Sequence, residues 1–472
     1  MTPSDVPPTG TTAKHAIGST TATTAEPSLA EATRVAKAAF VGTAIEWYDF
    51  YIYASTAALI FGDQFFPSMS PTAATLASFA TIAVAFVARP IGGVVFAHYG
   101  DRVGRKTTLI ASLMVMGVST MLVGVLPTYQ TAGAWAPVML VMLRFLQGAA
   151  VGGEWGGAVL MATEFAPPGR RARLSSWPQQ GVTAGLVLST AVLLFMSLAV
   201  PDEIYEDWAW RLPFLSSAVL IVVGLVLRLR IGESPVFEAN QAAKESQANR
   251  SGKRNQRNRP DKAGAAPSAH SLPIAVVLRE SRRTTLLTTL AYVSVSTTFY
   301  VAFVFLLSHA TGPLDLSKSA ALTAVLVSAG FYSIGLRLSA GVADKYGRRV
   351  ALLAGLAGMV AAVFPTLGLI QTGEPVLFVV GMSLFAFPIG ISYAPIGVYF
   401  AELFPTATRY SGITAANQAG SMLGAAVAPF IAIALYNSLG MYAVGMYVVL
   451  VCAISATAVH HLGETRHLDL KR

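Results

Sequence analysis

Twelve long apolar stretches occupy most of this 472-residue chain. They cover residues 36–57, 76–98, 107–126, 136–163, 176–200, 210–231, 284–307, 320–342, 349–370, 375–401, 411–436 and 440–461. At about 1.5 Å per helical residue, each stretch is long enough to cross a hydrocarbon core of about 30 Å. Only 12% of the residues are charged, against about 25% in soluble proteins. The sequence therefore predicts an all-α membrane protein with twelve transmembrane helices, and it argues against a soluble enzyme or a nucleic-acid-binding domain.

The loops between the stretches differ in charge. Most of the 33 Lys and Arg residues fall on the side that would hold both ends of the chain, whereas the opposite side carries acids such as Asp202 and Glu206. Basic loops stay in the cytoplasm. We therefore expect a multi-pass protein with both termini cytoplasmic.

Two motifs occur twice at nearly the same offset. Asp101 and Asp344 each open a basic, glycine-containing loop, and Glu164-x-x-Pro and Glu402-x-x-Pro each precede an arginine. Such duplication predicts two pseudo-symmetric six-helix halves related by an axis along the membrane normal. The expected organisation is a disordered cytoplasmic tail over 1–35, a first half over 36–231, a cytoplasmic loop over 232–283, a second half over 284–461 and a short tail over 462–472.

The string Asp101-Arg102-x-Gly104-Arg105-Lys106 resembles the loop motif of the major facilitator superfamily. Three further strings are similar to the metabolite:proton symporter family within it. They are Glu46-Trp-Tyr-Asp49-Phe, Arg89-Pro-Ile-Gly-Gly and Arg144-Phe-Leu-Gln-Gly. The resemblance implies the major facilitator fold, alternating access and a bacterial cell membrane. That family includes carriers for 2-oxoglutarate, citrate, shikimate, proline and betaine.

Charged side chains inside the apolar stretches are the strongest functional pointers, because each costs about 2.5–3.5 kcal/mol at the centre of a membrane helix. We predict that Asp49, with Glu46, takes a coupling proton and exchanges partnership with Arg144. A static ion pair that only fixes helix packing is the alternative. Glu154 is either a second proton site or a structural hydrogen-bond acceptor. Arg89 is the candidate for a substrate carboxylate, because guanidinium stays charged and offers a bidentate fork; pairing with Glu46 or Asp49 is the alternative.

Polar side chains in other stretches are candidates for neutral contacts with a substrate. Packing and interface anchoring are the alternatives for the tyrosines. The substrate-binding candidates besides Arg89 are Tyr292, Tyr300, Tyr393, Gln179 and Asn417.

The repeated loop motifs are candidates for a gate. By family resemblance, they latch the two halves on the cytoplasmic side while the carrier opens outward, and ion pairs that form in one state bias a two-state element. The gating candidates are Asp101, Arg102, Arg105, Glu164, Arg171, Asp344, Arg348, Glu402 and Arg409.

These features together predict a proton-coupled symporter that imports a small organic anion, such as a mono-, di- or tricarboxylate or a cyclic acid. Symport of a zwitterionic solute such as proline or betaine is the first alternative, and a non-transporting membrane sensor is the second. No nucleotide-binding, zinc or catalytic-serine motif occurs, and Cys452 is the only cysteine. We expect no cofactor, no metal and no nucleic-acid partner. The expected partners are the substrate, protons and the lipid bilayer, and the expected state is a monomer.

Overall fold

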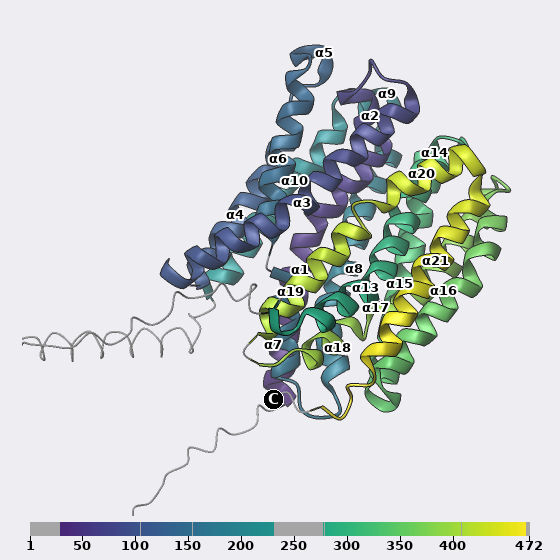
Figure 1. Cartoon of the computed structure of the whole chain (residues 1–472). Helices are drawn as coiled ribbons and strands as arrows, with labels where there is room; N and C mark the ends of the chain where they lie inside the picture. Colours follow the sequence, from purple (N-terminus) through teal and green to yellow (C-terminus); the bar gives the residue numbers. More distant parts are fainter. Residues whose placement is uncertain are drawn as a thin grey trace, which may run out of the picture.

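The computed structural model of the chain describes residues 29–103, 105–152, 154–230, 277, 279–406 and 408–468. Within these ranges, the side chains of residues 94, 97–109 and 227–230 are not described. Most of the expected tail over 1–35 and most of the expected loop over 232–283 therefore lie outside the description. All regular elements of the described ranges are helices (Figure 1).

The first half is built from six long helical segments. They are α1 (Leu29–Leu59), α3 (Pro71–Val103), α4 (Arg105–Val123), α6 (Trp135–Val151) followed by α7 (Glu154–Glu164), α8 (Arg171–Ala199) and α10 (Leu212–Arg230). Four short helices connect them, namely α2 (Phe61–Phe65), α5 (Tyr129–Ala132), α9 (Asp202–Asp207) and the 3-10 helix η1 (Ala209–Arg211).

The second half repeats this plan. Its segments are α13 (Arg282–Tyr300) continued by the π-helix η2 (Val301–Phe305) and α14 (Leu306–Thr311), α15 (Lys318–Tyr346), α16 (Arg348–Ile370), α17 (Pro375–Tyr393) with α18 (Ile396–Leu403), α19 (Arg409–Leu423) with α20 (Ala428–Leu439), and α21 (Met441–Leu462). The start of α1 and the last described residues after α21 lie at the same end of the bundle, beside α7 and α18 (Figure 1). We call this the termini end.

Ten of the described helical segments are long and apolar enough to cross a membrane. The other two of the twelve predicted segments are α1, whose charged residues include Glu46 and Asp49, and α4, of which Ile110–Val123 is a shorter apolar helix. The predicted twelve-helix architecture is confirmed, and α1 begins earlier than the predicted start of the first stretch.

Glycines allow α3 and α6 to cross at close range. A Cβ atom at Gly148 would overlap the main-chain carbonyl oxygen of Ala85, and one at Gly92 would overlap that of Ala149. Small residues let helix backbones approach in membranes. Gly92 and Gly148 follow Arg89 and Arg144 in the two sequence strings, so the same contact brings the two arginines to one level of the bundle.

Three of the long segments are interrupted rather than straight. The segment of α6 and α7 breaks after Val151, that of α17 and α18 breaks at Ala394 and Pro395, and that of α19 and α20 breaks after Leu423. Main-chain carbonyls at two of these breaks accept hydrogen bonds from glutamine side chains of the opposite half. Breaks of this kind are tolerated in membranes when neighbouring helices satisfy the backbone.

Candidate functional site

Four charged side chains from three helices of the first half are buried in the middle of the bundle. Helix α1 carries Glu46 and Asp49, α3 carries Arg89 and α6 carries Arg144, and none of the four is more than 5% exposed. Glu154 begins α7 just beyond the break and is half-buried. The structure therefore places the predicted ionisable residues together, although their roles stay predictions.

Arg89 is enclosed by aromatic rings. Its guanidinium carbon lies 4.4 Å from the ring centre of Phe86, 4.9 Å from that of Phe50 and 5.7 Å from that of Trp47. Within the described part of the chain, its Nε atom has no hydrogen-bond partner. Faces of aromatic rings attract a cation but satisfy none of its N–H groups, so Arg89 retains hydrogen-bonding capacity.

A small cavity adjoins this arginine, and all of its lining residues belong to the first half. It is lined by Glu46, Trp47, Phe50, Arg89, Met116, Gln147 and Val151. Gln147 of α6 also lines this cavity. The predicted proton residue Glu46 and the predicted substrate residue Arg89 therefore border the same cavity.

Asp49 is connected to Arg144 through intervening side chains. Arg144 Nη1 donates to Gln147 Oε1, and Gln147 Nε2 donates to Thr120 Oγ1 at 2.8 Å. Thr120 in turn lies beside Asp49, although its hydroxyl donates to the main-chain oxygen of Met116 at 3.0 Å. The Ser217 hydroxyl donates to Asp49 Oδ1 at 2.6 Å. We call Asp49, Thr120, Gln147 and Arg144 the relay.

The remaining surroundings of Arg144 are aromatic. Its guanidinium carbon lies 3.7 Å from the ring centre of Tyr53 and 5.0 Å from that of Phe50. Tyr53 donates its own hydroxyl proton to Thr81 Oγ1 at 2.5 Å. The sequence predictions missed Thr120, Ser217 and Tyr53, because hydroxyl-bearing residues are common in apolar helices and carry no charge to single them out.

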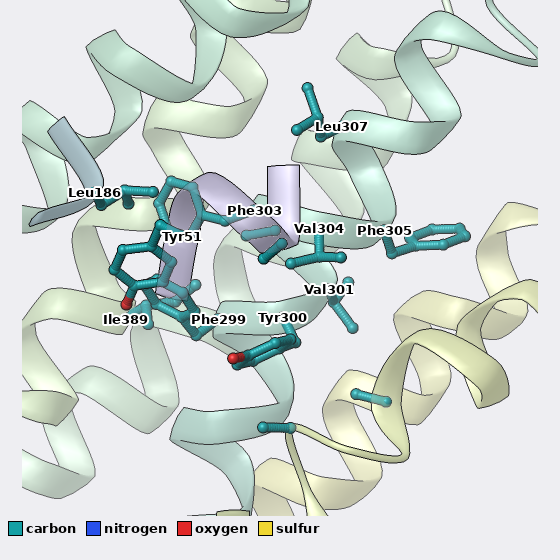
Figure 2. Packing of buried hydrophobic residues seen from close by; sticks show 14 of the residues in the cluster. Tyr51, Leu186, Phe299, Tyr300, Val301, Phe303, Val304, Phe305, Leu307 and Ile389 are labelled. Atoms are coloured by element: carbon teal, nitrogen blue, oxygen red, sulfur yellow. The ribbon is translucent and has the colours of Figure 1, made fainter. Parts of the chain in front are cut away.

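The predicted tyrosines of the second half face the same region. Tyr300 packs against Phe86 with ring centres 5.6 Å apart, and the Tyr292 hydroxyl lies beside Asn417 and Tyr393. Figure 2 shows Phe299 between Tyr300 and Tyr51 of α1, and the ring centres of Phe299 and Tyr300 are 5.9 Å apart. Phe299 and Tyr51 have ring centres 5.5 Å apart. Tyr300 and Tyr292 thus lie near Arg89, and Tyr393 and Asn417 lie beside Tyr292.

Gln179 holds the two halves together. Its Nε2 atom donates to the main-chain oxygen of Tyr393 at 3.0 Å, beside the break between α17 and α18. Gln418 makes the reciprocal contact from α19, donating to the main-chain oxygen of Gly152 at 2.9 Å. In this conformation, Gln179 is therefore engaged in contact between the halves.

The described gate candidates gather at the termini end, in a cluster that we call the latch: Glu164, Arg171, Asp344, Arg348, Glu402 and Arg409. Asp344 accepts hydrogen bonds from the main-chain N–H groups of Ala172 and Arg173, in the first turn of α8. Glu402 receives a bidentate hydrogen bond from Arg348, at 2.9 and 3.0 Å. Two further pairs cross between the halves, Arg171 with Glu402 at 3.6 Å and Arg409 with Glu164 at 3.5 Å. The side chains of Asp101, Arg102 and Arg105 lie outside the described residues.

The chain after α21 contributes to this latch. Thr465 donates its hydroxyl proton to Glu402 Oε2 at 2.7 Å, and Arg171 Nη1 donates to the main-chain oxygen of Leu468 at 3.1 Å. The opposite end has an ion pair between the halves, Lys318 with Glu206, and the Glu206 side chain is 57% exposed. Exposed pairs contribute little to stability, so the buried contacts of the latch favour closure at the termini end.

Metal chemistry is not supported by the described side chains, since no three His, Cys, Asp or Glu residues among them are grouped to hold an ion. The arrangement instead offers buried acids, buried arginines and a latch between two halves.

Comparison with known proteins assigns the family. Residues 35–472 match the family described as "Sugar (and other) transporter". The chain belongs to this family of major facilitator transporters. It is therefore a multi-pass membrane transporter and not an enzyme, and the predicted family resemblance is confirmed.

Curated relatives match almost the whole chain. The inner membrane metabolite transport protein YhjE of Escherichia coli K12 is 39% identical, over 93% of this chain and 95% of its own length. The shikimate transporter of the same strain is 35% identical, over 91% and 94%. A proline/betaine transporter of Salmonella typhimurium LT2 is 30% identical, over 92% and 84%.

Solved structures agree on the fold. A double-tryptophan mutant of XylE matches with a TM-score of 0.70 and 19% identity, covering 94% of this chain and 98% of that one. XylE with bound 6-bromo-6-deoxy-D-glucose, described as a proton:xylose symporter of the major facilitator superfamily, matches with a TM-score of 0.68 and 18% identity, covering 93% and 97%. At these identities the likeness establishes the twelve-helix fold alone.

Proposed function

We propose that this transporter is a proton symporter that imports a small organic anion by alternating access. The observation that carries the proposal is the burial of Asp49 and Arg89 in one half of the bundle, Asp49 with a hydrogen bond from Ser217 and Arg89 among aromatic rings with an unpartnered Nε atom. Ionisable groups inside membrane helices mark ion and substrate pathways. We place the protein in a bacterial cell membrane as a monomer. Both termini face the cytoplasm in this proposal, because described basic residues such as Arg171 and Arg349 lie at the termini end, in contact with the chain after α21.

Arg89 binds the substrate carboxylate in this proposal. Its guanidinium is shielded by three aromatic rings, which strengthens any charge-assisted hydrogen bond by excluding water. The unpartnered Nε atom supports a role in binding rather than in packing. The tyrosines of the second half and Asn417 supply neutral contacts once the carboxylate is bound.

Asp49 takes the coupling proton. A protonated Asp49 no longer attracts positive charge, so the hydrogen bonds of the relay rearrange and Arg144 is released toward another partner. Glu46 lies one helical turn away on the same face of α1, close to Arg89. Glu154 is a further proton-site candidate at the break between α6 and α7. Proton binding and substrate binding are thereby coupled through neighbouring residues.

The latch supplies the conformational switch. In the conformation described above, the ion pairs and helix-cap contacts at the termini end hold the halves together, as an outward-facing or occluded carrier requires. Opening toward the cytoplasm breaks the contacts of Asp344, Arg171 and Arg409 across the halves. A transporter that alternates between these states needs differential stabilisation of each state by its ligands.

The test is uptake by the purified full-length protein in proteoliposomes. Radiolabelled organic acids, proline and betaine are offered with an inside-alkaline pH gradient, with and without a protonophore. We expect gradient-dependent uptake of an organic acid that is lost in Asp49→Asn and reduced in Arg89→Lys. The control is Arg337→Lys, an exposed arginine of α15.

Uptake of proline or betaine alone would contradict the organic-anion proposal and favour a zwitterion carrier. Uptake that ignores the pH gradient would contradict proton symport. Absence of any transport, with the panel widened, would favour a membrane sensor.

A further inference from the structure

One aromatic ring lies close to both buried arginines of the first half. The ring centre of Phe50 is 4.9 Å from the guanidinium carbon of Arg89 and 5.0 Å from that of Arg144. The face of an aromatic ring attracts a cation, and the attraction is stronger where water is excluded. Two like charges also repel each other more strongly in a protein interior than in water. The positions of the two cations therefore depend on each other through the ring that they share.

The neighbouring rings differ from Phe50 in this respect. The ring centre of Phe86 lies 4.4 Å from the guanidinium carbon of Arg89, and that of Tyr53 lies 3.7 Å from the guanidinium carbon of Arg144. Within the described part of the chain, Phe50 is the only aromatic residue at such a distance from both arginines. The chain thus contains one ring for each arginine alone and one ring common to both.

Helix α1 places the common ring among the groups of the proposed proton site. Phe50 lies one helical turn after Glu46 and next to Asp49, and it is 4% exposed. It also lines the small cavity together with Arg89 and Gln147. The cavity leaves space beside the ring, so the ring can follow a movement of either guanidinium group.

Both arginines retain unused hydrogen-bond donors. Within the described ranges, the Nε atom of Arg89 and the Nε and Nη2 atoms of Arg144 have no hydrogen-bond partner. A ring face attracts the positive charge but satisfies few of the five N–H groups of a guanidinium. A carboxylate can therefore draw a guanidinium away from the ring, because it offers charge-assisted hydrogen bonds that the ring does not.

We propose that Phe50 is the positioning residue that couples the two arginines. A carboxylate bound at Arg89 neutralises one of the two cations that share the ring. Arg144 then moves toward the ring, and its hydrogen bond to Gln147, which is the first contact of the relay, rearranges. This inference rests on the proposed function, and it names the residue through which substrate binding reaches the proton site.

An electrostatic role of the ring differs from a packing role in a measurable way. A ligand changes a second site only through contacts that differ between two states. The attraction of the ring for two cations is such a contact, since binding at one cation changes it. Fluorine atoms on the ring weaken its attraction for cations and change its size little, so they leave a packing role almost unaffected.

The experiment replaces Phe50 by phenylalanines that carry one, two or three ring fluorines, and also makes Phe50→Leu. The full-length protein is reconstituted in proteoliposomes, and the ratio of protons to acid taken up is obtained from the external pH and the radiolabel. The acids offered are lactate, succinate, citrate and shikimate, and all variants are measured with the acid that the parent protein accumulates. We expect the ratio to fall stepwise with fluorination, and to fall about twofold to fivefold in Phe50→Leu, as for the loss of an ordinary cation–π contact.

The matched control is the same series at Phe86, whose ring contacts Arg89 but not Arg144. We expect the KM for the acid to rise about twofold to fivefold in Phe86→Leu, with an unchanged ratio of protons to acid. Melting temperatures in detergent identify variants that lose the fold. The fluorinated proteins keep the size of the ring, so they test the inference even if Phe50→Leu fails to fold.

Two results would overturn the role of Phe50 and leave the proposed function in place. One is a parent ratio that persists through the whole fluorine series at Phe50. The other is an equal fall of the ratio in the series at Phe86, which would assign the effect to packing around Arg89. A parent protein that accumulates none of the four acids, or accumulates one without taking up protons, would contradict the proposed function and with it this inference.

Discussion

Asp344 of α15 caps the first turn of α8 in the opposite half, accepting hydrogen bonds from the main-chain N–H groups of Ala172 and Arg173 at 2.9 and 3.0 Å. A carboxylate at a helix N-terminus is stabilised by the unsatisfied N–H groups and by the helix dipole. The contact joins the two halves directly, so it exists only while the termini end is closed.

Replacing this carboxylate should open the termini end. We expect Asp344→Ala to shift the population toward the cytoplasm-open state by about fivefold to thirtyfold, because a cap contact is worth about 1–2 kcal/mol. The measurement is the labelling rate of a single cysteine placed behind the latch in a Cys452→Ser background. Glu374→Ala, at an exposed residue, is the control. An unchanged labelling rate in Asp344→Ala would show that the cap does not hold the gate.

The relay gives a second prediction. Gln147→Leu removes both the acceptor of Arg144 and the donor to Thr120, so the hydrogen bonds that run from Arg144 to Thr120, the neighbour of Asp49, are lost. We expect gradient-driven uptake to fall about tenfold while substrate binding is retained, since one buried bridge is worth about 1.5 kcal/mol. Gln371→Leu, at an exposed position after α16, is the matched control. Equal losses of binding and uptake would instead assign Gln147 to the substrate site.

Helix crossing gives a third prediction. Gly148→Ala places a methyl group against main-chain atoms of Ala85 in α3. These atoms cannot move aside as the end of a flexible side chain could. We expect destabilisation of about 1–3 kcal/mol, the usual cost of overpacking, seen as a lower melting temperature in detergent. Gly42→Ala is the control, because no atom lies within 4 Å of the point that its methyl group would occupy. Equal melting temperatures for Gly148→Ala and the parent protein would contradict the close crossing of α3 and α6.

Glu464 gives a prediction about pH. Burial alone raises the pKa of its carboxyl, but the main-chain N–H groups of Arg348, Arg466, Arg349 and Thr465 outweigh burial and lower the pKa below its ordinary value of 4.5. A lowered folded-state pKa means that the carboxylate stabilises the fold above the unfolded-state pKa, and that this stability is lost as pH falls through the folded-state value.

The corresponding measurement is the melting temperature of the parent protein and of Glu464→Gln between pH 3 and pH 7. We expect the variant to melt lower at pH 7, and the difference to shrink as the pH falls below 4.5. Glu374→Gln, at an exposed residue, is the control. A difference that stays constant with pH would contradict the role of Glu464 as acceptor of the Arg348 and Arg349 N–H groups at the start of α16.

The sequence predicted the helices more fully than the contacts between them. Long apolar stretches identify spans because a membrane requires them, and charged residues such as Arg89 stand out within those stretches. The helix break beside Gly152 was not predicted. The main-chain oxygen of Gly152 accepts a hydrogen bond from Gln418 of the other half, and the local sequence does not show this partner. Tertiary partners of this kind leave no local pattern in the chain.

The charged residues of the site were predicted from the sequence, but its hydroxyl-bearing residues were not. Asp49 and Arg144 were singled out by charge, whereas Thr120 and Ser217 were missed because only their position beside Asp49 distinguishes them. The segment after α21 was expected to be a short tail, yet Thr465 contacts Glu402 in the latch. Hydroxyl groups become informative only when the fold shows what they face.

Proton movement coupled to substrate entry tests the central claim most directly. The external pH of a lightly buffered proteoliposome suspension is recorded when the transported organic acid is added, alongside its radiolabelled uptake. We predict that the external medium becomes alkaline with the parent protein. Asp49→Asn should abolish this proton uptake. The variant protein should still exchange labelled for unlabelled substrate. Substrate-dependent alkalinisation that persists in Asp49→Asn would contradict the assignment of the coupling proton to Asp49.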